Sequence, residues 1–208
     1  MEIDTLAHCG SSLKGEFIYR LNAVDIRSTW VQRQAILGKG ETAALEGMRL
    51  IHERLPFALR GIDSDNGSEF ISQSLWNYCK AHRLKFTRAR PQESKDQAHV
   101  EQKNFTHVRK MLGWQRFSSQ DSLECINALY NRPLRWLDNL FVPSVKLKSK
   151  TRIGSKIVGR YFPAMSPFKR LRECLGNEDK KIQELSCLRA SLTPFELAET
   201  VEKLLETV

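Results

Sequence analysis

The strongest constraint on this chain is a carboxylate at the end of an apolar strand, followed at once by a tight turn. The apolar run Leu55–Ile62 leads into Asp63-Ser64-Asp65, and Asn66-Gly67 comes next. Asparagine and glycine both tolerate positive φ, so this dipeptide turns a chain tightly. We therefore expect the strand to end at the edge of a sheet, with the Asp65 carboxylate within reach of a cation or a substrate.

Two further acidic residues stand on other expected elements. Asp4 lies in the apolar opening Glu2–Thr5, which reads as a first strand. Glu101 follows Asp65 after 35 intervening residues, and apolar residues recur around it at the spacing of a helix. Carboxylates that converge from separate elements suit hard divalent cations. Two such ions, about 3.5–4 Å apart, can activate a nucleophile and stabilise the leaving oxygen of a phosphodiester.

Asp4, the run Asp65-Asn66-Gly67-Ser68-Glu69-Phe70, and Glu101 with Asn104 three residues later resemble the DDE triad of retroviral-integrase-like transposases. These are the integrase cores of insertion-sequence enzymes, and the resemblance covers about residues 1–115. It implies a ribonuclease-H-like α/β fold, a mixed five-stranded sheet flanked by helices. It also implies that the triad is catalytic and binds two Mg²⁺ or Mn²⁺ ions.

The same resemblance implies DNA as the partner, both transposon ends and target, bound by a homo-oligomer in the active complex. Transposases of this family usually carry an amino-terminal helix-turn-helix region before the core. Because Asp4 is the fourth residue here, we expect either an internal fragment of a longer enzyme or a truncated gene product.

The order of expected elements agrees with such a fold. Strand-like runs alternate with turn residues early in the chain, and helical periodicity follows. A polar segment broken by Pro91 separates the last expected strand from the helix of Glu101. The expected strands are 1–8, 16–24, 30–37, the run that ends at Asp65, and 84–87; the expected helices before Glu101 are 41–55 and the segment containing Ile71, Leu75, Tyr78 and Cys79.

We divide the chain into a catalytic core at 1–142, a basic connector at 143–165 and a small helical appendage at 166–208. Pro167 and Pro194 each follow a hydroxyl residue, which is typical of the first position of a helix. The apolar stripe of the last helix either packs on the core, which we favour, or supports oligomerisation. Trp114, Trp136 and Phe141 are expected in the core rather than as base-stacking groups.

The net charge of +9 is unevenly distributed. Residues 144–172 contain nine basic side chains and no acidic one, whereas residues 173–208 contain eight acidic and four basic side chains. A DNA backbone is a natural partner for the basic part, and a solvated basic surface is the alternative. The expected DNA-binding residues are Lys103, Asn104, Arg109, Arg88, Arg90, Lys146, Lys148, Lys150 and Arg152.

Other features narrow the protein class. The five cysteines include no Cys-x-x-Cys pair, which favours reduced thiols in a cytoplasmic protein. We expect neither a membrane span nor a signal peptide, since the apolar runs are short and residue 2 is acidic. His8-Cys9 lacks the second ligand pair of a structural zinc site, so ordinary strand-end roles are expected. Asp63 is a candidate for orienting the ligands beside it.

Three functional hypotheses follow. The first is a DNA transposase or integrase core that cleaves and joins strands with divalent metal ions. The second is a catalytically silent DNA-binding or regulatory remnant of such an enzyme. The third is a ribonuclease-H-like nuclease acting on hybrids, which the spacing from Asp65 to Glu101 disfavours because that spacing belongs to the integrase branch.

Overall fold

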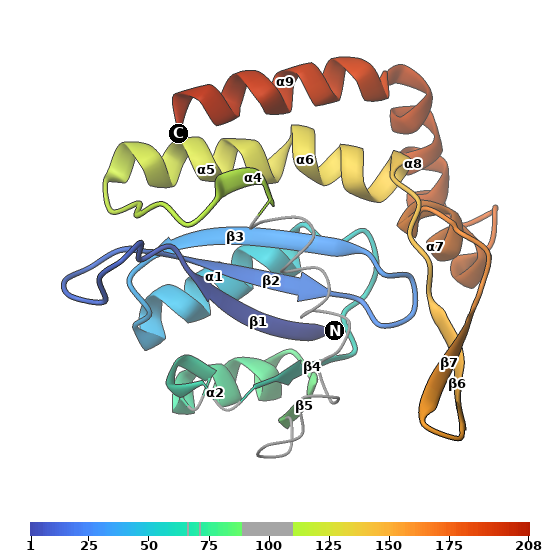
Figure 1. Ribbon diagram of the computed structural model, residues 1–208, viewed down its shortest axis with the longest axis horizontal. Coiled ribbons are helices and arrows are strands. Elements are labelled where there is room, and N and C mark those ends of the chain that lie inside the picture. Colours follow the sequence, from blue (N-terminus) through green and yellow to red (C-terminus); the bar gives the residue numbers. More distant parts are fainter. Residues whose placement is uncertain (66, 71, 89–109) are drawn as a thin grey trace.

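The computed structural model describes residues 1–65, 67–70, 72–88 and 110–208. Five strands form its central sheet: β1 (Glu2–Ala7), β2 (Ile18–Val24), β3 (Val31–Leu37), β4 (Gly61–Ser64) and β5 (Lys85–Arg88). Their order is β3-β2-β1-β4-β5 (Figure 1). β1 and β3 pair antiparallel with β2, whereas β4 pairs parallel with both β1 and β5. The expected mixed five-stranded sheet is confirmed.

Helices α1 (Glu41–Glu53) and α2 (Gln73–Ala81) cover one face of the sheet, and the short 3₁₀ helix η1 (Ser68–Phe70) precedes α2. Met48 of α1 packs with Leu21 and Ile36 in the core beneath this layer. Gly47 permits the close approach of α1, because a Cβ there would lie 2.4 Å from Leu21 Cδ1. The apolar side chains on this face of the early strands therefore pack against the apolar face of α1, as expected for an amphipathic helix.

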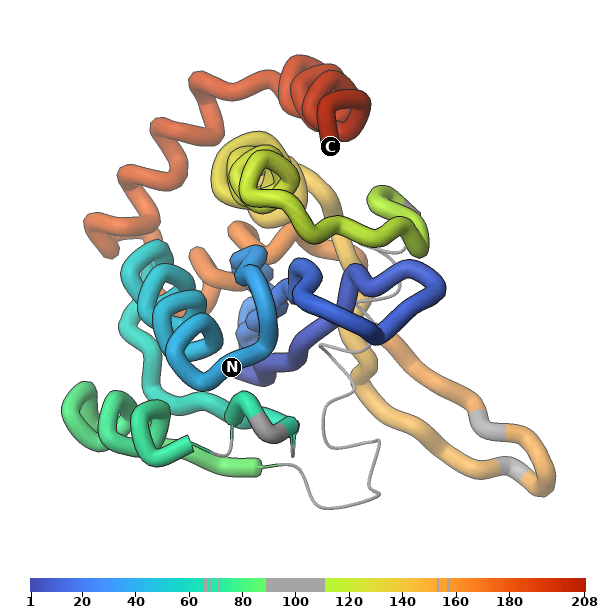
Figure 2. Tube along the Cα trace, turned by 90° about the vertical axis from the view of Figure 1, so that its left-hand side faces the viewer, coloured from blue at the N-terminus to red at the C-terminus, as the bar shows by residue number. Residues whose placement is uncertain are grey.

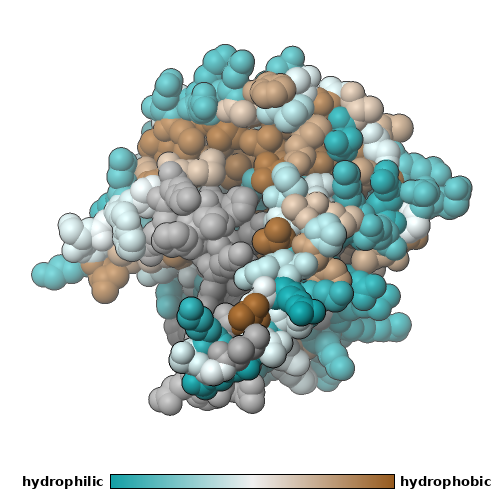
Figure 3. All heavy atoms as spheres, turned by 45° about the vertical axis from the view of Figure 1, so that its right-hand side comes forward, coloured by the Kyte–Doolittle hydropathy of each residue, from teal (hydrophilic) through white to brown (hydrophobic). Residues whose placement is uncertain are grey.

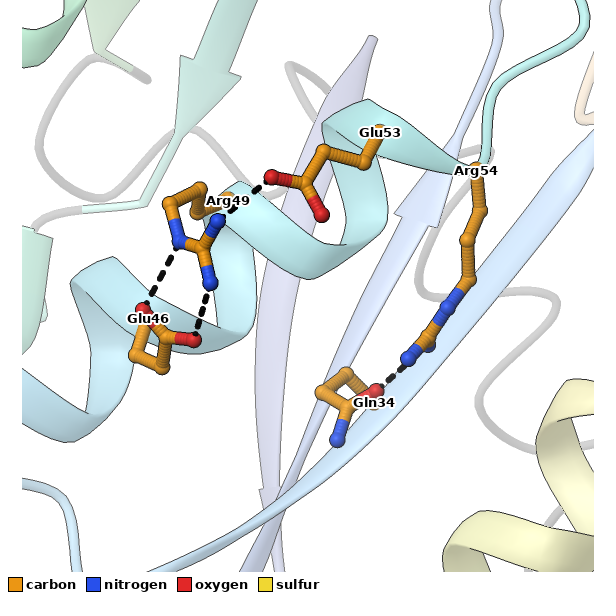
Figure 4. A network of polar contacts seen from close by, with 5 residues as sticks. All are labelled: Gln34, Glu46, Arg49, Glu53 and Arg54. Carbon is orange, nitrogen blue, oxygen red and sulfur yellow. Dashed lines mark hydrogen bonds and ion pairs between the residues drawn. The ribbon is translucent and has the colours of Figure 1, made fainter.

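Polar contacts fix the far end of α1. On the solvent side, Arg49 bonds Glu46 and Glu53 at 2.7 and 2.5 Å (Figure 4). Such exposed ion pairs contribute little to stability. Arg54, which follows the helix, donates to Gln34 Oε1 at 2.6 Å and so ties the end of α1 to β3.

A second helical layer covers the opposite face. After the short α4 (Lys110–Leu112), this layer comprises α5 (Gln120–Asn131), α6 (Pro133–Trp136), the π-helical η4 (Leu137–Phe141) and α9 (Pro194–Thr207), which lies alongside them (Figure 1). Ile126 and Leu129 pack on Ile18 and Ala35 of the sheet, and Val201 of α9 joins this core. Figure 3 shows apolar side chains gathered at the top of the molecule, where α9 meets the other helices. The last helix therefore packs on the core, as favoured from its stripe.

The three aromatic residues that were expected in the core differ in their burial. Trp136 and Phe141 pack against the buried cluster around Trp30 and Leu140, as expected. Trp114 is 72% exposed, so the expectation of a core position was wrong. Gly113 adopts φ +65°, which turns the chain after α4 and leaves the indole outside the helical layer.

Two further helices complete the carboxyl-terminal region, α7 (Pro167–Leu175) and α8 (Lys180–Ser191). Ser166 caps α7 by accepting from the amide of Lys169, with Pro167 in the first turn, as its sequence indicates. Phe168 and Leu171 pack with Trp30, so this region shares a core with the sheet. Among the described residues, no helix has both the length and the apolar character needed to cross a membrane.

Asparagine side chains occupy the free edge of β3. Asn139 Oδ1 accepts from Val31 N at 2.8 Å, and its Nδ2 donates to Val31 O at 2.8 Å. Asn127 makes the same two contacts with Ala35, at 2.8 and 3.0 Å. Each amide therefore satisfies both backbone groups of one edge residue, as a neighbouring strand would.

Charged side chains are buried between this edge of the sheet and the second helical layer. Arg33 of β3 forms an ion pair with Asp138 of η4 at 2.7 Å, and the two side chains are only 1% and 7% exposed. Arg20 of β2 lies beside the ring of Tyr130, 5.9 Å from its centroid. Burial lowers the pKa of Arg20 to about 10, although Tyr130 opposes that shift.

The segment expected as a basic connector forms a β-hairpin. β6 (Leu147–Ile153) and β7 (Lys156–Tyr161) pair antiparallel in a separate two-stranded sheet. Gly154 and Ser155 make the two-residue turn, with Gly154 at φ +61°. Figures 1 and 2 show the hairpin projecting away from the central sheet.

Candidate active site

The structure places Asp4 in β1 and Asp65 directly after β4, the strand that pairs parallel with β1. β1 and β4 pair with Glu2 opposite Asp63 and Ile3 opposite Ser64. Continuing that register by one residue sets Asp4 opposite Asp65, just beyond the carboxyl end of β4. Ile3 belongs to the core beneath α1 and α2, so Asp4 points to the other face.

A local turn orients Asp65. Its Oδ1 accepts a hydrogen bond from Gly67 N at 3.0 Å, as the Asn-Gly sequence suggests for an aspartate that precedes a turn. Burial raises the pKa of Asp65, the Gly67 amide opposes this shift, and the charge of Glu69 adds to it. The carboxylate is therefore half-buried in a setting that favours a neutralising partner, either a proton or a cation.

Glu69 is the site residue that the sequence reasoning missed. It is 3% exposed, and its Oε1 accepts from Thr5 Oγ1 at 2.5 Å. Its Oε2 lies 3.1 Å from Lys39 Nζ, in the segment between β3 and α1. Burial alone would raise the pKa of Glu69, but the bonds from Thr5 and Lys39 outweigh it and hold the pKa below its ordinary value. Glu69 thus joins β1, the segment after β3 and the turn after β4.

Gly67 allows the carboxylates of Asp65 and Glu69 to lie close to the same stretch of backbone. A Cβ on Gly67 would lie 2.8 Å from Glu69 Oε2 and 3.0 Å from Asp65 Oδ1. Both oxygens therefore border the space beside this glycine, and any larger residue would displace one of them. The only sequence signal for this role was the motif itself, in which a glycine stands between an aspartate and a glutamate.

Asp63 contributes to the neighbouring strand pair. Thr87 Oγ1 of β5 donates to Asp63 Oδ1 at 2.5 Å, so this carboxylate links β4 to β5. Arg88, at the end of β5, is exposed, and its guanidinium lies 5.5 Å from the ring centre of Phe86.

Other expected site residues lie outside the described part of the chain. These are the third acidic residue, Glu101, and the expected DNA-binding residues Arg90, Lys103, Asn104 and Arg109. Within the described residues, no three His, Cys, Asp or Glu side chains form a group suited to a metal ion. Asp4 and Asp65 offer the oxygen ligands that Mg²⁺ and Mn²⁺ prefer, so the described part of the site fits such an ion in chemistry though not in ligand number.

The expected DNA-binding residues of the basic segment fall into two groups. Lys148, Lys150 and Arg152 are exposed on β6. Lys146 precedes the hairpin, and its Nζ donates to Ile26 O at 2.7 Å and Arg27 O at 3.2 Å. Its ammonium therefore anchors the hairpin to the turn between β2 and β3.

The sequence is similar to that of a protein from Sinorhizobium fredii. No family model matches the sequence. The uncharacterized protein y4rM of Sinorhizobium fredii (strain NBRC 101917 / NGR234) is 34% identical over 170 residues, which are 82% of this chain and 48% of that protein. The chain thus spans about half the length of this curated relative.

The matches among solved structures include an integrase catalytic core domain and an intasome chain, with different TM-scores. The catalytic core domain of BIV integrase gives a TM-score of 0.52 at 19% identity, over 83% of this chain and 93% of that one. A chain of the simian T-cell lymphotropic virus intasome in complex with PP2A regulatory subunit B56 gamma gives 0.48 at 17% identity, over 67% and 48%. The likeness to the BIV domain identifies the α/β fold as the ribonuclease-H-like fold of an integrase catalytic core.

Proposed function

We propose that this chain is the catalytic core of a DNA transposase or integrase, which cleaves and joins DNA strands with two divalent metal ions, Mg²⁺ or Mn²⁺. The observation that carries the proposal is the position of Asp4 in β1 and of Asp65 directly after the adjoining strand β4, in an integrase-core fold. Carboxylates from neighbouring segments can hold the metal ions used in phosphoryl transfer.

In this proposal each of the acidic residues has a specific role at the metal site. Asp4 and Asp65 would share the metal ions, and Glu101 would complete one of the two sites. Bound ions would supply activation of a hydroxyl nucleophile and stabilisation of the leaving oxygen. Glu69, with its bonds to Thr5 and Lys39, would hold the turn that presents Asp65.

Metal binding tests the assignment without any knowledge of the DNA ends. We expect calorimetric titration with Mn²⁺ to detect binding by the wild type and to detect none by Asp65→Asn or Asp4→Asn. Glu46→Gln is the matched control, because Glu46 is an exposed carboxylate of α1 that pairs with Arg49. Equal binding by wild type and Asp65→Asn would contradict the assignment.

Activity provides the second test. We expect strand cleavage and joining on duplex oligonucleotides in Mn²⁺ to be lost in Glu101→Gln, with Glu46→Gln again as the control. Equal activity of wild type and Glu101→Gln would remove Glu101 from the triad.

A silent DNA-binding or regulatory remnant is the second candidate function. It shares with the first candidate the exposed basic side chains of the β6–β7 hairpin. Such a remnant would bind DNA and require no metal ion. Absence of Mn²⁺ binding by the wild type at millimolar metal, together with retained DNA binding, would favour this alternative.

A further inference from the structure

The β6–β7 hairpin is unusual because side chains on both of its faces are exposed. Ser149 and Arg160 are exposed on one face, Lys150 and Tyr161 on the other. Figures 1 and 2 show the hairpin standing away from both helical layers. A two-stranded ribbon alone is at best marginally stable in water. A partner that covers both faces would supply the missing contacts.

The charges of the hairpin indicate what that partner is. It carries Lys148, Lys150, Arg152, Lys156 and Arg160, and residues 144–172 contain no acidic side chain. These five cations are exposed. Because the sequence of this segment supplies no acidic side chain to balance these cations, a polyanion is the complementary surface.

The register divides the cations between the two faces. Lys150 pairs with Gly159, and Arg152 shares its face, since side chains two residues apart in a strand point the same way. Arg160 pairs with Ser149 on the opposite face, which Lys156 shares. Each face therefore presents at least two of the five cations, and Lys148 lies at the register irregularity between Leu147 and Ser149. A flat acidic surface would engage only one of these pairs.

The root of the hairpin is fixed to the body of the protein. The buried Arg170 of α7 donates to Thr29 Oγ1 at 2.6 Å and to Ser144 Oγ at 3.0 Å, and it also bonds Ser144 O. Ser144 and Met165 form an isolated β-bridge just before and after the two strands. With Lys146 bonded to the β2–β3 turn, the ribbon leaves the body in a defined direction.

We propose that the β6–β7 hairpin is an arm that lies in a groove of duplex DNA, with its two faces turned toward the two phosphate backbones that border the groove. The major groove of B-DNA admits a two-stranded ribbon. The two cation pairs then meet opposite strands, which accounts for charge on both faces. The inference rests on the proposed function only in taking DNA as the partner, and it involves neither the triad nor a metal ion.

The salt dependence of DNA binding tests the arm. The full chain is titrated with a fluorescent duplex in EDTA over a range of salt concentrations, so that no strand is cut. Each lost phosphate contact lowers the slope of log K against log salt by about one unit. We expect Lys150→Ala with Arg152→Ala to lower the slope by about two units, and Lys156→Ala with Arg160→Ala to do the same.

The matched control is Lys80→Ala with Lys203→Ala, which removes the same charge from exposed positions on α2 and α9. We expect this pair to leave the slope unchanged. Because all six residues are exposed, the variants should fold, and circular dichroism checks this.

Three results would overturn the proposal. One is a slope that changes for only one hairpin pair, which indicates DNA lying on one face. Another is equal affinity and slope for a single strand of the same length, since a single strand has no groove. The third is equally effective competition by polyglutamate, which indicates an acidic protein as the partner. Failure of the proposed function is distinguishable, because Mn²⁺ binding does not depend on the hairpin cations.

Discussion

Replacement of Asp138 by asparagine tests how the buried charges support the sheet. Asp138 and Arg33 form a contact of 2.7 Å between side chains that are almost fully buried. Arg20, a second buried cation, lies on the adjacent strand, and the charge of Arg33 already contributes to the lowered pKa of Arg20. Asp138→Asn would therefore leave the positive charge of Arg33 uncompensated beside a like charge.

The expected loss can be estimated from the burial of this pair. Two unit charges 4 Å apart attract by about 4 kcal/mol at an effective dielectric constant near 20. Removal of one partner from a buried pair typically destabilises by about 3–5 kcal/mol. Asparagine retains an acceptor for Arg33, so we expect a value near the lower end, about 3 kcal/mol. At a urea m-value of about 2 kcal/mol/M, the midpoint would fall by about 1.5 M.

Urea unfolding followed by circular dichroism measures this shift. Glu46→Gln serves as the matched control, because it removes a carboxylate from the exposed ion pair with Arg49. Its midpoint should not move measurably. The double variant Arg33→Met with Asp138→Leu should lose less than Asp138→Asn, since it leaves no buried charge at this position. If Asp138→Asn shifts the midpoint no more than Glu46→Gln does, the buried ion pair of Arg33 and Asp138 does not stabilise the fold as inferred.

Three further predictions concern the site and the sheet edge. Gly67→Ala should displace a carboxylate of the site and weaken Mn²⁺ binding at least tenfold in calorimetry, because its Cβ would lie 2.8 Å from Glu69 Oε2; unchanged affinity would contradict this geometry. Asn139→Leu should lower the free energy of unfolding by about 1–3 kcal/mol per backbone group left unpaired at Val31, measured in urea, and a loss below about 0.5 kcal/mol would argue against the edge contacts. Because the pKa of Glu69 is lowered from its ordinary value of 4.5, ionised Glu69 stabilises the fold at pH values above 4.5, and this stabilisation is lost as the pH falls through the lowered pKa. Thr5→Val removes the hydrogen bond to Glu69, so the free energy of unfolding should fall less steeply with decreasing pH than in the wild type. Parallel curves of unfolding free energy against pH for the two proteins would contradict this role of the hydrogen bond.

The order of elements was predictable because each element carries its own local signal. Helical periodicity identified α1 and α2, and Ser166 followed by Pro167 identified the start of α7. The parallel pairing of β1 with β4 was not predicted individually, since no local pattern specifies which distant strands will pair. Asp65 and Asp4 were singled out from their local sequences, and the family resemblance then assigned them to one triad.

The sequence of the hairpin contains a strand-like alternation, although the segment was interpreted as a connector. Lys146, Lys148, Lys150 and Arg152 alternate with other residues at a period of two, which is the period of a strand. Alternation usually indicates a half-buried strand when one set of residues is apolar. Here the residues between the cations are Val145, Leu147, Ser149, Thr151 and Ile153. Two polar residues interrupt this apolar set, and the segment therefore reads as a connector. The turn at Gly154 was the remaining clue.

The burial of Glu69 could not be read from the sequence. A glutamate that follows an Asn-Gly turn is ordinarily solvated, and its neutralising partners, Thr5 and Lys39, are 64 and 30 positions away along the chain. Only the tertiary fold brings these three segments together. The same holds for Asn127 and Asn139, whose side chains meet β3 across more than 90 positions.

The asparagine contacts along β3 have a consequence for how copies of this protein can associate. An edge strand with free amides and carbonyls is a template onto which another chain can add a strand. At Val31 and Ala35 those groups are already bonded by Asn139 and Asn127. A strand of a second molecule therefore cannot pair with β3 at these two residues. Copies that associate at this part of β3 would have to do so through the side-chain surfaces of α5 and η4, which carry the two asparagines.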